Sequence, residues 1–181
     1  MTRTTEAERI KSLQRYEILD TPPDGSFDHI TALASKIFNM PIVLITLVDK
    51  DRIWFKSRYG MDAIQIDKDD GLCSSAIIGK EIYLVEDASK DPRCLANPLV
   101  AGEFGLRFYA AAPLQTKDGY NLGTLCLIDK VQRYINKDQL TMLHDLAQIV
   151  MDQMELRLEA RITARKATEW IAERSKEQDR V

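Results

Sequence analysis

The stretch RFYAAAPLQTKDGYNLGTLCLID, residues 107–129, decides the fold because it predicts a β-hairpin. Its first arm, residues 107–114, is apolar with small residues in the middle, and its second arm, residues 120–129, is a longer apolar run. Between the arms, Lys117-Asp118-Gly119 supplies residue types that tolerate the backbone angles of a tight connection. Gly123 inside the second arm indicates a bulge or a close approach of another backbone. The alanines and this glycine leave space above the sheet, which protein or a ligand must fill.

The length and the charge of the chain limit its possible functions. With 181 residues it is long enough for one domain with a buried core and an appendage. It has 28 acidic and 25 basic residues and a net charge of -3, so no basic field favours nucleic acid or an anionic membrane. No apolar run approaches the ~20 residues that span a bilayer, and the N-terminus has no signal-peptide pattern. We therefore expect a cytoplasmic protein that binds neither nucleic acid nor membrane.

The cysteines, histidines and carboxylates of the chain do not form a recognisable catalytic motif. Cys73, Cys94 and Cys126 are odd in number and have no CxxC spacing, which argues against a disulfide framework and against a zinc site. No His lies close in sequence to a nucleophile, and paired carboxylates and a Gly-rich phosphate loop are lacking. We expect reduced thiols, no catalytic residues and no metal site, and hence no enzyme.

The apolar pattern upstream of the hairpin predicts two helices and two strands. Residues 10–19 predict an N-terminal helix, and residues 26–38 follow a 3.6-residue period typical of a second one. The continuous apolar run 42–48 predicts a central strand, and the alternation over 52–59 predicts its antiparallel neighbour.

Shorter elements follow before the hairpin. Residues 60–72 predict a surface loop able to act as a lid, residues 73–78 a short helix and residues 82–85 a short strand. Pro92 predicts the first turn of a one- or two-turn helix, and residues 99–104 predict a further turn. The fold class is α+β, with a mainly antiparallel sheet and helices packed against it.

A long helix is predicted from Asn136 onwards. Its apolar residues make a broad stripe as far as Leu158, and beyond that point charged residues dominate. The extension cannot fold alone against this core. A partner helix in a two-fold dimer or an attached neighbour would stabilise it, and a frayed chain end is the alternative.

Four strings of sequence together resemble a GAF domain, of the bacterial subgroup found ahead of sensor histidine kinases and diguanylate cyclases. The resemblance covers residues 8–159 and implies a PAS-related antiparallel sheet of about six strands flanked by helices. It also implies a pocket between the hairpin face and residues 73–93. The strings are YEILDTPPDGSFDHITALASKIFNMPIVLITLVDKDRIWFKS (16–57), CSSAI (73–77), VEDASKDPRCLANPLV (85–100) and LRFYAAAPLQTKDGYNLGTLCLID (106–129).

The resemblance also suggests how the chain is organised and what it contacts. It implies an N-terminal helix at residues 1–20, the GAF domain at 21–159 and an extension of a signalling and dimerisation helix at 160–181. Members of the subgroup sit beside an output domain. We therefore expect a homodimer through the N- and C-terminal helices and an output kinase or cyclase as partner.

No ligand or cofactor can be named from the resemblance. Cyclic-nucleotide-binding members carry Asn-Lys followed by Phe and an acidic pair, and Asn136-Lys137 lacks that continuation. Bilin-binding members commonly have a His after the attachment Cys, and no cysteine of this chain does. The cysteine contexts also differ from those of members that reduce free methionine sulfoxide. The cofactor is therefore unknown, and fold alone cannot choose one.

Three candidate ligand-binding residues lie before the hairpin in the sequence, in the segment that is predicted to form the pocket wall. Cys73 lies at a helix start, where the dipole would make a thiol reactive, although a small buried core residue is the simpler interpretation. Asp87 and Arg93 could form a salt bridge that pins the wall, or Arg93 could face an anionic ligand with its planar donors.

Three further candidates complete the predicted site. Asn97 could offer its amide to a ligand, although before Pro98 it is also a typical turn residue. Tyr109 and Ala111 share one face of the first hairpin arm, and we expect both to line the cavity.

The leading hypothesis from the sequence is a sensory GAF module of bacterial signal transduction that binds an unidentified small molecule. Occupancy of its pocket would shift the terminal helices of a dimer and so bias an output. One alternative is a dimerisation module with a collapsed pocket and no ligand. The other is a thiol-dependent enzyme similar to free methionine sulfoxide reductases.

Overall fold

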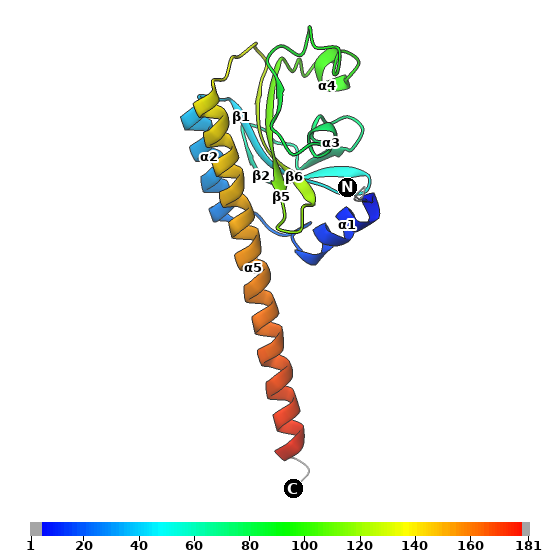
Figure 1. Cartoon of the computed structure of the whole chain (residues 1–181), viewed down its shortest axis with the longest axis vertical. Coiled ribbons are helices and arrows are strands. Elements are labelled where there is room, and N and C mark those ends of the chain that lie inside the picture. The colour runs from blue at the N-terminus through cyan, green and yellow to red at the C-terminus, as the bar shows by residue number, and fades with distance from the viewer. Residues whose placement is uncertain (1–4, 179–181) are drawn as a thin grey trace.

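A computed structural model describes residues 5–178 (Figure 1). Its centre is a six-stranded antiparallel sheet with the strand order β3-β2-β1-β6-β5-β4. The strands are β1 (Ile42–Val48), β2 (Arg52–Tyr59), β3 (Gln65–Asp67), β4 (Tyr83–Val85), β5 (Phe108–Gln115) and β6 (Asn121–Asp129). The helices are α1 (Glu6–Arg15), α2 (Gly25–Phe38), α3 (Cys73–Ala76), α4 (Pro98–Ala101) and α5 (Lys137–Gln178). The α+β class expected from the sequence is confirmed.

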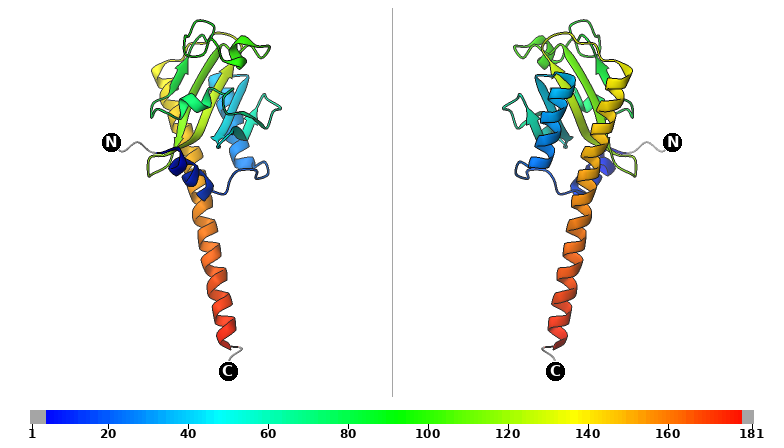
Figure 2. Two further views of the ribbon diagram at one scale, coloured as in Figure 1. Left: turned by 90° about the vertical axis from the view of Figure 1, so that its right-hand side faces the viewer. Right: turned by 90° about the vertical axis from the view of Figure 1, so that its left-hand side faces the viewer.

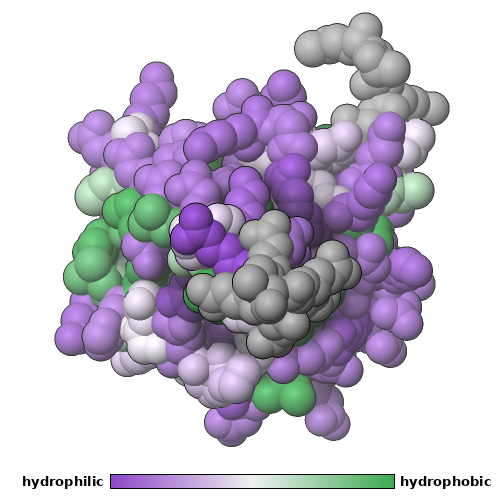
Figure 3. Space-filling view, turned by 90° about the horizontal axis from the view of Figure 1, so that it is seen from below, coloured by the Kyte–Doolittle hydropathy of each residue, from purple (hydrophilic) through white to green (hydrophobic). Residues whose placement is uncertain are grey.

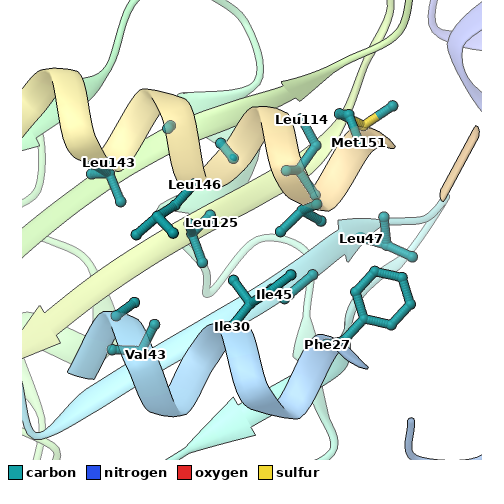
Figure 4. Packing of buried hydrophobic residues seen from close by; sticks show 14 of the residues in the cluster. Phe27, Ile30, Val43, Ile45, Leu47, Leu114, Leu125, Leu143, Leu146 and Met151 are labelled. Atoms are coloured by element: carbon teal, nitrogen blue, oxygen red, sulfur yellow. The ribbon is translucent and has the colours of Figure 1, made fainter. Parts of the chain in front are cut away.

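The sheet separates two hydrophobic clusters. Helices α2 and α5 lie side by side over one face, and their apolar stripes pack there against Ile45 and Leu125 (Figure 4). Helices α3 and α4 and the segment between them cover the opposite face, where Leu44 and Cys126 point. Because successive side chains of a strand alternate in direction, β1 and β6 supply both clusters. This explains why the apolar runs of these two strands are continuous.

The hairpin forms as predicted. β5 and β6 pair from Phe108↔Asp129 to Gln115↔Asn121, and Gly119 takes a φ of +90° in the connection. Gly123 pairs with Leu47 of β1, and a Cβ added to it would lie 1.8 Å from the carbonyl oxygen of Thr46. The space left by this glycine is therefore filled by the backbone of β1.

Three local predictions differ from the structure. The first helix ends at Arg15, because Glu17 and Asp20 take positive φ values of 47° and 58° and turn the chain. Residues 60–72 contain β3, which pairs with β2 at the edge of the sheet, so this segment is more than a loop. Pro92 lies in a series of turns, and the helix begins six residues later at Pro98. These segments are short, so packing outweighs local propensity.

Helix α5 continues far beyond the sheet (Figure 2). The segment that links α1 to α2 contacts α5 at the point where α5 leaves the domain. The backbone carbonyl of Glu17 accepts a hydrogen bond of 3.0 Å from Arg161, and its carboxylate pairs with Arg165 at 2.7 Å. Among residues 5–178, no helix combines the length with the apolar character that crossing a bilayer would require.

Two further contacts hold the same junction from the domain side. The Arg157 guanidinium pairs with Asp24 and lies 4.7 Å from the centre of the Phe27 ring. The Tyr16 hydroxyl donates a 2.6 Å hydrogen bond to the Glu155 carboxylate. The direction in which α5 leaves the domain is therefore set by the α1–α2 link.

Replacing Tyr16 by Phe should destabilise the domain by about 1–2 kcal/mol, because the hydrogen bond is lost while the buried ring remains. Burial and the hydrogen bond to Glu155 raise the pKa of Tyr16 to about 12. The neutral phenol is favoured in the folded state, so its contribution is complete below pH ~10 and is lost as the pH rises towards 12. Urea unfolding of the unaltered chain and of Tyr16→Phe at pH 8 and at pH 11 measures this. The same difference in unfolding free energy between the two proteins at the two pH values would contradict the prediction.

Candidate functional site

A ring of polar side chains lies beneath α3 on one face of the sheet. Cys73 is the first residue of α3, and its sulfur meets side chains from the three strands below. β1, β6 and β5 are neighbours in the sheet, which places these strand residues beside one another. The strand members of the ring are Thr46, Tyr109, Thr124 and Cys126.

The members of this ring form hydrogen bonds in the buried interior. The Tyr109 hydroxyl donates to the Cys73 sulfur at 3.1 Å. The hydroxyl oxygens of Thr46 and Thr124 are 2.9 Å apart. Both hydroxyls and the Cys126 thiol lie near enough to the Cys73 sulfur to lower its pKa. Cys73 is 5% exposed and the other four residues are 1% exposed or less, so bulk water does not compete for these bonds.

The hydrogen bonds make the two thiols of this ring unequal. Donors converge on the Cys73 sulfur, first among them the Cys126 thiol, and they lower the pKa of Cys73. The hydrogen bond to Cys73 and burial raise the pKa of Cys126, and burial likewise raises the pKa of Tyr109. Cys73 is therefore the group of this ring that ionises first.

An interior cavity of about 30 Å³ adjoins the ring. Cys73, Leu72 and Tyr109 form part of its wall, and its other lining residues are apolar or glycine. One water molecule occupies about 30 Å³ in the liquid. The cavity thus has room for a water-sized molecule and none for a metabolite.

The structure brings together three of the six predicted site residues. Cys73 and Tyr109 lie in the ring and, as described above, in the cavity wall, whereas Ala111 pairs with Cys126 in the register of β5 and β6 and does not line the cavity. Asn97 links α4 to the segment that carries Asp70 and does not line the cavity. Its side-chain oxygen caps α4 by accepting from the Leu99 amide at 2.9 Å, and its side-chain amide donates to the Asp70 carbonyl at 2.9 Å.

The other two predicted residues lie apart from the cavity. In the described part of the chain, Asp87 and Arg93 form no ion pair, because each has a nearer partner. Asp87 pairs with Lys90 at 2.7 Å, and Arg93 pairs with Asp91. The bonds from Lys90 and Ser89 lower the pKa of Asp87 to about 2.

Arg93 is also held to the domain surface. It lies 4.7 Å from the centre of the Tyr83 ring and donates to the Leu84 carbonyl at 2.7 Å. The open hollow lined by Asp87 and Arg93 shares no lining residue with the interior cavity. The expected salt bridge across the pocket wall is therefore wrong.

Two members of the ring are not among the predicted site residues. Thr46 and Thr124 each stand inside an otherwise apolar strand, and they are direct partners in the pairing of β1 with β6. A lone hydroxyl in each of two apolar strands was the available signal. Cys126 is expected from the sequence only as one of three reduced thiols, and the structure buries it in the same cluster as Cys73.

Comparison with known proteins supports one family. The GAF domain family matches residues 22–154. A cyclic di-GMP phosphodiesterase of Pseudomonas aeruginosa is 40% identical over 157 residues, which are 86% of this chain and 25% of that protein. The chain thus spans a quarter of the length of this relative.

Solved structures show the same fold at low identity. The free methionine-R-sulfoxide reductase from Neisseria meningitidis in complex with its substrate has a TM-score of 0.62 at 19% identity, covering 88% of this chain and 96% of that one. The GAF domain from Acinetobacter phosphoenolpyruvate-protein phosphotransferase has a TM-score of 0.62 at 17% identity, covering 86% and 95%. These likenesses show the fold alone. From the match over residues 22–154, the chain belongs to the GAF domain family.

Proposed function

We propose that this domain is a regulatory module of a bacterial signalling protein that works as a homodimer and transmits its state through α5. The observation that carries this proposal is a row of exposed apolar side chains along α5. Met142, Ile149 and Leu156 recur every seven residues and are 41%, 46% and 59% exposed. Trp170, 55% exposed, continues the same spacing two heptads later.

A seven-residue recurrence of apolar side chains is typical of a helix that packs along a second helix. The row begins beside the sheet and continues on the part of α5 beyond it. Ala160 and Ala167 stand four residues after two successive positions of the spacing, 156 and 163, and their small side chains allow two backbones to approach closely there. These features favour a parallel pair of α5 helices.

Helix α2 widens the apolar surface. Leu33 and Ile37, one turn apart, are 51% and 42% exposed on the helix that lies beside α5. Seen from the C-terminal end, apolar side chains gather on the flank where α2 lies (Figure 3). A surface that contributes the same residues from both protomers suits a two-fold dimer.

The output domain is proposed from the relative in Pseudomonas aeruginosa, which is named a cyclic di-GMP phosphodiesterase. We propose that the output reached through α5 makes or degrades cyclic di-GMP. This favours a cyclase or a phosphodiesterase over the kinase.

The small interior cavity favours regulation without a bound metabolite. A cavity of about 30 Å³ excludes a drug-sized ligand, whose sites are ten times larger or more. The dimerisation module is thus better supported than a sensor whose metabolite binds in this cavity. The likeness to methionine sulfoxide reductases is a likeness of fold and does not favour that enzyme.

Native mass spectrometry of the purified chain tests the proposal. We expect a dimer at micromolar concentration, with no small molecule lost on denaturation. A monomer at tens of micromolar would contradict the dimer, whereas a stoichiometric small molecule would favour the metabolite sensor.

A further inference from the structure

The two thiols beneath α3 are placed for chemistry that dimerisation does not use. Cys73 and Cys126 come from different elements, 53 positions apart in the chain, and they lie in one buried cluster, close enough that each thiol shifts the pKa of the other. A disulfide requires two sulfurs that can approach without backbone rearrangement. Two neighbouring thiols in one buried cluster are placed for this approach.

The surroundings of Cys73 favour a thiolate nucleophile. The Tyr109 hydroxyl donates to its sulfur at 3.1 Å, and the hydroxyls of Thr46 and Thr124 lie in the same buried ring. Hydrogen bonds to the charged form of a group stabilise that form. Cys94 differs, since its sulfur donates to the Ala88 and Asp91 carbonyls at 3.7 and 3.6 Å and receives no comparable bond among the described residues.

The adjoining cavity limits what can react. It measures about 30 Å³ and has Cys73 and Tyr109 in its wall. A molecule of roughly the size of water can enter such a space, and a peroxide is the smallest two-electron oxidant of thiols. Larger oxidants such as glutathione disulfide are excluded.

We infer that Cys73 and Cys126 form an oxidisable pair, in which a small peroxide oxidises Cys73 and Cys126 then closes a disulfide between α3 and β6. The Cys73 sulfur attacks one oxygen of hydrogen peroxide, so an S–O bond forms and the O–O bond breaks. The thiol proton leaves with the second oxygen as water, and the sulfur has lost two electrons as a sulfenic acid.

The second step resolves this acid. The Cys126 sulfur attacks the Cys73 sulfur, an S–S bond forms, and the S–O bond breaks. The hydroxide takes the Cys126 proton and leaves as water. The inference goes beyond the proposed function and does not depend on it, because a monomer has both thiols.

Oxidation of the purified chain tests the inference. The protein is treated with hydrogen peroxide, denatured, alkylated at its remaining thiols and digested for mass spectrometry. We expect a peptide linked through Cys73 and Cys126, with Cys94 alkylated. A linkage through Cys94, or three reduced thiols after hours in excess peroxide, would overturn the inference.

Variants separate the roles of the residues. In Cys126→Ser, the sulfenic acid should persist at Cys73 and react with dimedone when the oxidised protein is denatured in its presence, whereas Cys94→Ser should form the same linked peptide as the unaltered chain. Tyr109→Phe should slow the oxidation of Cys73 at least about fivefold, because a donor to a charged sulfur is lost. An unchanged rate in a folded Tyr109→Phe protein would exclude Tyr109 from positioning this thiolate, and the linked peptide of the unaltered chain remains an independent test.

Discussion

Replacing Gly123 by Ala should destabilise the domain by at least about 3 kcal/mol, enough to abolish folding in a marginally stable protein. The added Cβ would lie 1.8 Å from the carbonyl oxygen of Thr46 and 2.8 Å from the Cα of Leu47. Both atoms belong to the backbone of the central strand β1, which pairs with β6 from Ile42↔Ile128 to Leu47↔Gly123. No side-chain rotation relieves this contact. The two strands must separate, and the hydrogen bonds between them are lost.

The matched control for this variant is Gly25→Ala. Gly25 is the first residue of α2, and a Cβ added there would meet no atom within 4 Å. Alanine in a helix is favoured over glycine, so this variant should be neutral or more stable by up to about 1 kcal/mol. Circular dichroism and urea unfolding of both variants provide the measurement. A Gly123→Ala protein that unfolds at the same urea concentration as the unaltered chain would mean that β1 and β6 are less close than described.

The double variant Ile149→Glu, Leu156→Glu should weaken the proposed dimer at least about 100-fold, while leaving the domain folded. Each of these side chains is about half exposed in the isolated protomer and would be covered by the partner helix. Loss of a buried aliphatic side chain costs about 1.5–3 kcal/mol, and two per protomer make four in the dimer. The glutamates also place like charges opposite one another across the two-fold axis. Sedimentation equilibrium of the variant against the unaltered chain measures the change.

The control for the dimer carries the same charges elsewhere on α5. His144 and Gln148 are exposed and lie on another side of the helix from the apolar row, because consecutive residues are about 100° apart. His144→Glu, Gln148→Glu should therefore keep the dimer of the unaltered chain. Equal weakening in both double variants would point to net charge as the cause, and a dimer that withstands the changes in the row would exclude the row as the interface.

The hairpin and the central strands were predictable because their signals are local. The apolar run of β1 and the turn residues before Gly119 are contiguous in sequence, and each specifies an element without help from distant residues. The same holds for α2, whose apolar period indicates the face that it buries. Where the signal was weak, as at β3 and around Pro92, the structure differs from the prediction.

The candidate site was predictable only in part. Tyr109 and Ala111 share one face of β5, as expected, because strand alternation follows from local pattern. Asp87 and Arg93 were paired wrongly, because the choice of an ionic partner depends on which side chain is nearest after folding. Lys90 and Asp91, each within three residues, take those contacts.

The sequence by itself determined the family, the class of fold, the long C-terminal helix and the strands that line the interior. Only the tertiary structure decided that Thr46 and Thr124, 78 residues apart, share a hydrogen bond beneath Cys73. The tertiary structure also decided that the interior cavity measures only about 30 Å³. Local patterns specify elements because backbone geometry repeats within each of them. Contacts and cavities arise between elements, and there the close packing of many distant side chains determines which groups meet and how much space remains.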